Sequence, residues 1–157
     1  IMELLEQRQI VIKGGYNRDI ALVKLFEHYI EKKLVEPTFV IDYPKASSPL
    51  ARPHRINPKL VERFELFIAG LEVANGYTEQ NNAYEQYIAF REQEERRRHG
   101  DEEAQEPDYD FVEALCVGMP PAGGIGIGID RLVMLFTGIT SIKEAIPFPM
   151  VKRAKFT

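Results

Sequence analysis

The chain has little cysteine, no long apolar run and no internal repeat. Its single cysteine, Cys116, cannot form an internal disulfide bond. This favours a reducing compartment and predicts that the thiol is a small buried hydrophobic group rather than a nucleophile. No run of about 18 apolar residues indicates a membrane-spanning helix, and no signal-peptide pattern is visible. We therefore expect a cytoplasmic protein with no membrane partner.

The chain also lacks an excess of positive charge. Its 20 Lys and Arg residues stand against 24 Asp and Glu residues, which gives a formal net charge of -4. A protein whose main surface binds nucleic acid usually carries a basic stripe, so we expect no DNA partner and only local contact with RNA. With 157 residues, of which 45% are hydrophobic and 28% charged, the chain is long enough for one domain with its own core.

Glycine, by contrast, is concentrated in one short stretch. Residues 123–136 read GGIGIGIDRLVMLF, in which glycine and isoleucine alternate as in a β-strand before an apolar helix begins. One face of the predicted strand carries Gly124, Gly126 and Gly128, and the other carries Ile125, Ile127 and Ile129. We expect the isoleucines to pack in the core, while the bare glycine face leaves room for a ligand or another backbone.

Asp130 and Arg131 follow directly, at the predicted start of the helix. An arginine beside a bare strand face is well placed to bind a phosphate group through its planar fork of donors. The pattern alone is equally compatible with a structural ion pair of Arg131 beneath a tightly packed helix. The run lacks the third glycine of the dinucleotide fingerprint, so we do not predict a Rossmann domain.

Residues 62–79 predict a β-hairpin with acidic residues on one face. If the two residues that flank a turn at 69–70 pair directly, then Glu65 and Glu72 lie on the same face, about 7 Å apart. Two carboxylates at this spacing suit Mg²⁺, which takes hard oxygen ligands and completes its shell with phosphates and water. The alternative is that both acids face solvent on an antiparallel sheet.

In a regular ladder the next polar residues of the second strand would fall on the wrong face. Asn75, Tyr77 and Glu79 share one face because they are two residues apart, but Asn75 is three residues from Glu72. We therefore predict a β-bulge around residues 73–76, with the glycine at position 76 accommodating it. Such a bulge returns Asn75 and Glu79 to the face of the acidic pair.

Three further segments have helical patterns. They lie at residues 17–34, where Asn17 is a candidate N-cap, and at 82–99 and 110–117. A short strand is predicted at residues 38–43. The charged end of the second helix reads as a solvated face, to which we assign no chemistry.

Taken together, these motifs resemble class II aminoacyl-tRNA synthetases, and within that class the lysyl-tRNA synthetase family. GIGIGIDRLVMLF resembles motif 3 of the class, and RFELFIAGLEVANGYTEQN resembles a signature of the lysyl enzymes. The similarity runs from about residue 17 to residue 153 and includes TFVIDYP and SSPLAR. It implies an α+β fold, an antiparallel β-sheet flanked by helices, as part of a class II synthetase catalytic core.

The resemblance also implies roles for individual residues. Arg131 matches the motif 3 arginine that contacts the ATP phosphates, and it is the implied catalytic residue. The residues implied in ATP binding are Glu65, Glu72, Gly124, Gly128 and Arg131. The two glutamates are also the implied ligands of Mg²⁺. The residues implied in lysine binding are Asn75, Tyr77, Glu79 and Gly126.

Elementary chemistry agrees with this assignment. The ammonium group of lysine has three donors and no acceptor, so a pocket for it needs anionic or carbonyl oxygens, which Glu79 and Asn75 can supply. Activation of a carboxylate by ATP needs cations and positioned donors at the phosphates rather than a protein nucleophile. The implied activity is ATP-dependent activation of L-lysine and its transfer to tRNA(Lys), by an enzyme that is a homodimer when full-length.

Parts of the family pattern are not visible in this sequence. Motif 1, motif 2 and the anticodon-binding domain are missing, so we expect residues 1–157 to be the carboxy-terminal part of the catalytic domain and to be inactive alone. Two alternatives remain open. One is a synthetase paralogue that attaches a lysine-type amino acid to an elongation factor, and the other is a non-catalytic interaction module that kept the fold.

Overall fold

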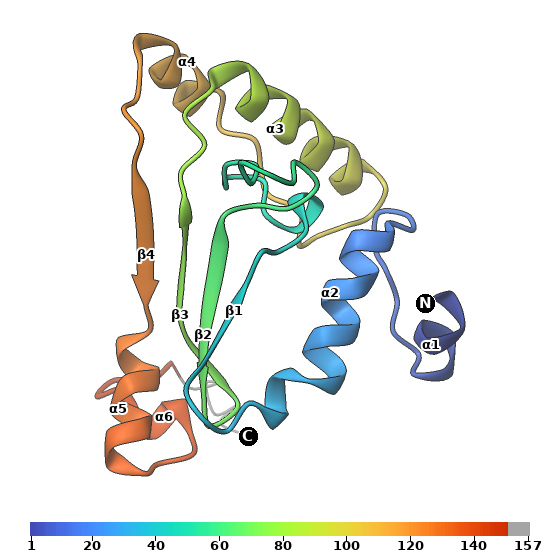
Figure 1. Ribbon diagram of the computed structural model, residues 1–157. Coiled ribbons are helices and arrows are strands. Elements are labelled where there is room, and N and C mark those ends of the chain that lie inside the picture. The colour runs from blue at the N-terminus through green and yellow to red at the C-terminus, as the bar shows by residue number, and fades with distance from the viewer. Residues whose placement is uncertain (151–157) are drawn as a thin grey trace, which may run out of the picture.

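A four-stranded antiparallel sheet, with the strands in the order β1-β2-β3-β4, is the centre of the computed structural model, which describes residues 1–150 (Figure 1). The strands are β1 (Thr38–Ile41), β2 (Arg63–Ile68), β3 (Leu71–Thr78) and β4 (Gly123–Ile127). The helices are α1 (Met2–Gln7), α2 (Arg18–Tyr29), α3 (Ala83–Arg98), α4 (Tyr109–Val117), α5 (Ile129–Thr137) and α6 (Ile142–Ala145), with 3₁₀ turns η1 (Glu31–Lys33) and η2 (Lys45–Ser47). The predicted α+β fold is confirmed, although the end of the predicted similarity, residues 151–153, lies outside the described residues.

The helices predicted at residues 17–34, 82–99 and 110–117 are present, and a side chain caps the N-terminus of each. Asn17 accepts hydrogen bonds from two backbone N–H groups at the start of α2, and Asn82 does the same for α3. Asp108 caps α4 through one such bond. α2 ends at Tyr29, earlier than the predicted residue 34, because the chain tightens into η1 directly afterwards.

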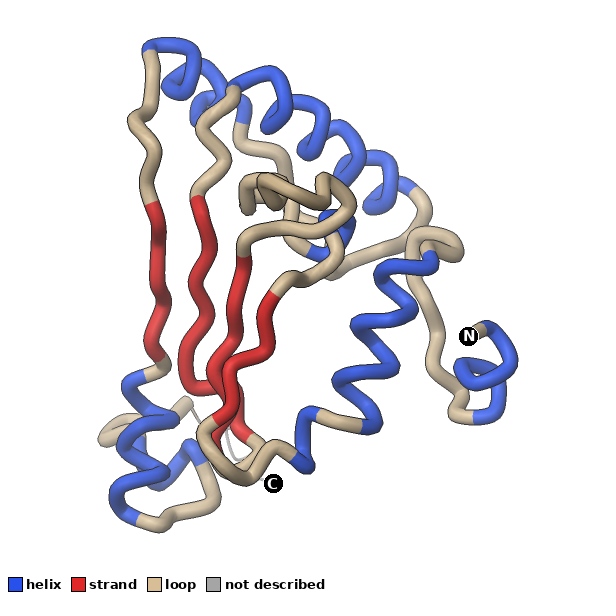
Figure 2. The backbone as a smooth tube through the Cα atoms, in the orientation of Figure 1, coloured by secondary structure: helices blue, strands red, loops and turns tan. Residues whose placement is uncertain are grey.

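The helices surround the sheet unevenly. In Figures 1 and 2, α2 runs along one face of the sheet, α3 and α4 lie across one end, and α5 and α6 lie beside the other end, after β4. Phe26 of α2 packs edge-on against Phe67 of β2, with ring centroids 5.8 Å apart, and Phe67 is only 1% exposed. The face that carries Phe67 is therefore the face that α2 covers.

The strand register assigns the remaining side chains to the two faces. Across the four strands, Val40 pairs with Glu65, Glu65 with Asn75, and Asn75 with Gly126. This row shares its face with Phe67, and we call this side of the sheet the glycine face. The opposite side, which we call the isoleucine face, carries Phe39, Ile41, Phe64, Leu66, Ala74, Gly76, Ile125 and Ile127.

The β2–β3 hairpin forms as predicted, with its turn at Ala69 and Gly70. Both residues have positive φ, 53° and 72°, as a two-residue type I′ turn requires. The backbone N–H of Ala69 donates to the carbonyl of Val35 at 2.8 Å, and that of Gly70 donates to the carbonyl of Leu34 at 2.9 Å. The turn is therefore bonded to the segment that follows η1.

The predicted bulge is also present, opposite the boundary between Leu66 and Phe67. Phe67 pairs with Glu72 and Leu66 with Ala74, so Val73 is the extra residue. The prediction that the glycine at position 76 accommodates the bulge is wrong. Gly76 pairs regularly with Phe64, and a Cβ there would lie 2.7 Å from the Phe64 ring, so this glycine serves strand packing instead.

The predicted packing of the isoleucines is not found. Ile125 is 63% and Ile127 51% exposed, and Ile129 at the start of α5 is exposed as well. The reason is architectural: within residues 1–150, α2 packs on the glycine face, and β4 is an edge strand. The alternating pattern therefore predicted two distinct faces correctly. The prediction that the isoleucine face is the buried one is wrong, because α2 packs on the glycine face.

Two predictions about individual side chains also fail. Cys116 is exposed, because α4 buries only Leu115. Arg96, at the charged end of α3, is not solvated but forms an ion pair with Asp101, which is almost fully buried. Arg96 also donates to the carbonyl of Ala46 at 3.4 Å, so it joins α3 to the loop after β1.

The buried apolar centre lies where this loop meets the sheet. Tyr43, Ala51 and Val61 form it, and Val23 of α2 packs against them.

None of the helices within residues 1–150 combines the length and the apolar character that crossing a membrane requires.

Candidate functional site

The hairpin and the glycine strand lie side by side. β3 pairs antiparallel with β4, with Asn75 opposite Gly126 and Tyr77 opposite Gly124. Since paired residues in a sheet share a face, these side chains point to the same side as the bare positions of β4. The backbone N–H of Glu79 donates to the carbonyl of Ala122 at 3.0 Å, which continues the contact past the end of β3.

The three glycines of the predicted strand leave room for different groups. A Cβ on Gly124 would lie 2.1 Å from Oε1 of Glu79, so the carboxylate of Glu79 occupies the space above this glycine. A Cβ on Gly126 would meet only the backbone oxygen of Asn75, at 3.8 Å, so the space above Gly126 is open. Gly128 faces the side chain of Arg131, whose Cδ would lie 3.4 Å from such a Cβ.

Arg131 lies at the other end of this glycine face, in the first turn of α5. Its Nη1 donates to the backbone carbonyl of Glu72 and lies 3.3 Å from Oε2 of the same residue. The side chain is partly exposed, and Nε and Nη2 have no hydrogen-bond partner among residues 1–150. The guanidinium is thus anchored on one nitrogen and can present the other two to an anion.

Glu65 is held more firmly than Glu72. Its Oε1 forms an ion pair with Arg63, and its Oε2 accepts a hydrogen bond of 2.6 Å from the hydroxyl of Tyr43. Burial raises the pKa of Glu65, opposed by the Tyr43 hydrogen bond and the Arg63 charge, while the charge of Glu72 raises it further. The register places both glutamates on the glycine face, because Glu65 is two residues from Phe67 and Phe67 pairs with Glu72.

Further groups with perturbed pKa values surround the pair. Burial and the hydrogen bond to Glu65 raise the pKa of the Tyr43 hydroxyl, so it stays a donor. Burial raises the pKa of Glu31, in η1, and the charges of Glu27 and Glu72 raise it further. Burial raises the pKa of Tyr77, and the charge of Glu79 raises it further.

The carboxylates of this site suit a cation that takes most of its ligands from substrate and water rather than from the protein. Among residues 1–150, no group of three or more His, Cys, Asp or Glu side chains is arranged to hold a metal ion. Glu65 and Glu72 nevertheless offer hard carboxylate oxygens on one face of the sheet, which fits Mg²⁺ bound mainly by phosphates and water. Because both oxygens of Glu65 already have partners, Glu72 is the more available ligand.

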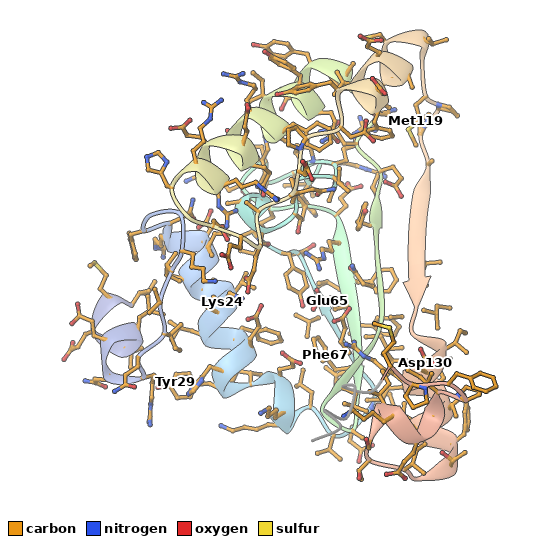
Figure 3. All side chains as sticks on the ribbon, turned by 180° about the vertical axis from the view of Figure 1, so that it is seen from behind. Lys24, Tyr29, Glu65, Phe67, Met119 and Asp130 are labelled. Atoms are coloured by element: carbon orange, nitrogen blue, oxygen red, sulfur yellow. The ribbon has the colours of Figure 1, made fainter. Side chains whose placement is uncertain are left out.

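A cavity of about 280 Å³ lies between α2 and the sheet. It is lined by Arg63, Glu65 and Tyr43 on the sheet side and by residues such as Val23 and Lys24 on α2. Figure 3 shows Glu65 and Phe67 on the side of β2 that faces α2, and Asp130 at the start of α5. The cavity does not reach the glycines of β4, whose face is open to solvent within the described residues.

Sequence analysis missed Arg63, which contacts both the acidic pair and the polar row. Its Nε donates to Oδ1 of Asn75 at 3.0 Å, so the oxygen predicted to receive an ammonium group is already engaged. Arg63 precedes Glu65 by two residues on β2, and this spacing alone could have placed it on the same face. No pattern in the sequence indicates that its partners in the loop, Ser47 and Ser48, lie beside it.

Comparisons with known proteins identify the family of this chain. Residues 7–152 match the family described as "tRNA synthetases class II (D, K and N)". Over 132 residues the chain is 62% identical to a lysine–tRNA ligase of Methanospirillum hungatei, covering 84% of the chain and 26% of that protein. It is 53% identical over 152 residues to one of Saccharolobus solfataricus, covering 96% of the chain and 31% of that protein.

A bacterial relative, the lysine–tRNA ligase of a Thermotoga species, is 52% identical over 135 residues, which cover 86% of the chain and 27% of that protein. The chain thus spans roughly a quarter to a third of the length of these relatives. The antiparallel sheet, the glycine strand that leads into Arg131 and the family match over residues 7–152 lead to one conclusion: the chain belongs to the class II tRNA synthetases of the D, K and N group.

Proposed function

We propose that residues 1–157 form the part of a lysine–tRNA ligase catalytic domain that binds the amino acid and the ATP phosphates. The observation that carries the proposal is the β3–β4 register, which sets Asn75 and Tyr77 against the bare strand β4, directly before the helix that carries Arg131. The printed names of the relatives support lysine as the amino acid. The single cysteine supports action in the cytoplasm. A homodimeric full-length protein is supported by the family resemblance alone.

In the proposed reaction, a carboxylate oxygen of lysine attacks the α-phosphorus of ATP. The bond between that phosphorus and the bridging oxygen breaks, and pyrophosphate leaves. A hydroxyl of tRNA(Lys) then attacks the carbonyl carbon of the adenylate, and AMP leaves. The protein contributes position and charge to both steps, which is why this chemistry needs no nucleophilic side chain.

The lysine side of the site is assigned to β3 and β4. Glu79 supplies an anionic oxygen for the lysine ammonium, and its place above Gly124 fixes where that charge lies. Tyr77 contacts the aliphatic part of the substrate. The open space above Gly126 receives the amino acid itself, because no side chain fills it.

The phosphate side is assigned to the start of α5 and the bulge of β3. Arg131 binds the phosphates through the nitrogens that Glu72 does not occupy. Glu72, with Glu65 behind it, would hold Mg²⁺, which when bound neutralises phosphate charge. Gly128 leaves the Arg131 side chain room to lie beside the strand.

The test uses the natural full-length protein that contains this segment. Lysine-dependent ATP–pyrophosphate exchange and charging of tRNA(Lys) are measured for the wild type, for Arg131→Ala and for Arg55→Ala. We expect Arg131→Ala to lower exchange about 100-fold or more, because a positioned donor at the phosphates is lost. Arg55, which pairs with Glu62 at 2.8 Å and is mostly exposed, is the matched control and should have little effect.

Each other outcome is informative. A wild type without lysine-dependent exchange would exclude the ligase and favour an interaction module. Exchange without charging of tRNA, but with modification of an elongation factor, would identify the paralogue instead. Strong exchange by residues 1–157 alone would contradict the expectation that this part of the site is inactive by itself.

A further inference from the structure

Arg63 is the best-connected side chain of the glycine face, although the proposed function gives it no contact with substrate. It lies at the start of β2, opposite Tyr77, and its side chain is only 17% exposed. β3, which carries Asn75, separates Arg63 from the open space above Gly126 on β4. An arginine that is this deeply buried needs partners for all of its donors, because an unpaired buried charge is costly.

Every nitrogen of the Arg63 guanidinium has a partner. Nε donates to Oδ1 of Asn75 at 3.0 Å, and Nη2 is paired with Glu65. Nη1 donates to the hydroxyl of Ser48 at 2.7 Å and, more weakly, to the carbonyl of Ser47 at 3.4 Å. The guanidinium carbon also lies 4.8 Å from the centroid of the Tyr43 ring, in a cation–π contact.

The bond to Asn75 decides which end of the amide faces the ligand. A guanidinium has donors only, so its partner in the amide must be the oxygen, and the alternative amide orientation would place two donors together. The Nδ2 of Asn75 has no partner among residues 1–150. Asn75 therefore presents N–H groups toward the space beside Gly126, its neighbour across the ladder.

This polarity selects the group that Asn75 can bind. An ammonium also has donors only, so it cannot accept from Nδ2 and must be bound by Glu79 instead. An oxygen of the amino acid's carboxylate can accept from Nδ2. The glycine face therefore offers a hydrogen-bond donor at Asn75, whose orientation Arg63 fixes, and a separate acceptor at Glu79.

We propose that Arg63 is a positioning residue: it fixes the Asn75 amide with its N–H groups toward the site, so that Asn75 recognises an oxygen of the amino-acid substrate. The inference rests on the proposed function, since it assumes that lysine binds above Gly126. Lysine at position 63 would keep the charge beside Glu65 but, lacking the planar fork, cannot hold Asn75, Ser48 and Glu65 together.

The test measures KM for lysine and for ATP separately, by pyrophosphate exchange in the natural full-length protein. We expect Arg63→Lys to raise the KM for lysine about tenfold or more, while the KM for ATP changes about twofold at most. Arg55→Lys, at an arginine outside the site, is the matched control and should change neither. The double variant Arg63→Lys/Asn75→Ala should have the same KM for lysine as Asn75→Ala alone, because Arg63 acts through Asn75.

A second variant keeps the inference testable if Arg63→Lys does not fold. Asn75→Asp retains an oxygen for Arg63 but has no N–H groups, so the KM for lysine should again rise about tenfold or more at unchanged melting temperature. An unchanged KM for lysine in a folded Arg63→Lys or Asn75→Asp protein would overturn the inference. An equal rise in both KM values, additive with Asn75→Ala, would also overturn it and assign Arg63 a structural role only.

These outcomes differ from a failure of the proposed function. If the wild type shows no lysine-dependent exchange, the function is wrong and the inference falls with it. If the wild type is active and the variants behave like Arg55→Lys, only the role of Arg63 is wrong.

Discussion

The two faces of the sheet differ in almost every respect, although one alternating pattern produces both. On the glycine face, polar side chains of β2 and β3 and of Tyr43, which follows β1, share hydrogen bonds, and α2 packs against Phe67. On the isoleucine face, Ile125 and Ile127 have more than half of their surface exposed in the described residues. The comparison shows that burial in this chain follows the helix that packs on a face rather than the hydrophobicity of its side chains.

The largest difference between the faces is expected from paired phenylalanine substitutions. Phe67→Ala should lower the free energy of unfolding by about 3–5 kcal/mol, because it removes a buried ring that contacts Phe26. Phe39→Ala, on the isoleucine face, should cost about 1 kcal/mol or less, since that ring is already 62% exposed. Urea denaturation of both variants measures the comparison, and equal costs would show that the two faces are buried alike.

A smaller cost is expected where the isoleucine face is tightly packed at one point. Gly76→Ala places a Cβ 2.7 Å from the Phe64 ring and 2.8 Å from the backbone oxygen of Gly124. The strands must separate or the ring must move, which should cost about 1–3 kcal/mol. The melting temperature should therefore fall clearly, and an unchanged value would show that Phe64 turns aside without strain.

Gly126→Ala tests the opposite situation on the glycine face. The new Cβ meets nothing closer than the Asn75 oxygen at 3.8 Å, so stability should stay the same or rise by about 0.4–1 kcal/mol. Lysine-dependent exchange by the full-length protein should nevertheless fall about tenfold or more, because the methyl group fills space for the substrate. A stable and fully active variant would remove Gly126 from the site.

The smallest effect is expected at an exposed isoleucine. Ile127→Thr keeps a β-branched side chain suited to a strand and exposes no new buried group, so it should change stability by about 0.5 kcal/mol or less. Thermal denaturation of the 157-residue chain measures this. A loss of several kcal/mol would show that the isoleucine face is covered in solution.

Local patterns were sufficient to predict the four strands and the longer helices, but not α1, η1 or η2. The cap at Asn17, the hairpin turn and the bulge at Val73 each depend on residues close together in sequence. The resemblance assigns residues of both the hairpin and the glycine strand to one site, and the register places β3 and β4 side by side. The roles assigned to the residues on that face remain proposals.

Contacts between distant segments could not be predicted in this way. The Arg63 network includes Ser48, which precedes it by 15 residues and lies in an irregular loop. The pairing of Arg96 with Asp101 was missed because a run of charges of both signs at a helix end usually faces solvent. The alternation predicted that the isoleucines lie on the face opposite the glycines. Whether that face is buried depends on where α2 packs, and α2 packs on the glycine face.

The turn of the hairpin has a mechanical consequence. Its two amide groups are bonded to the carbonyls of Val35 and Leu34, immediately after η1, so α2 and the hairpin are joined at this end as well as through Phe26 and Phe67. A hinge motion that lifts α2 away from β2 must break both attachments together. Within residues 1–150, α2 and the β2–β3 hairpin are therefore expected to move as one unit.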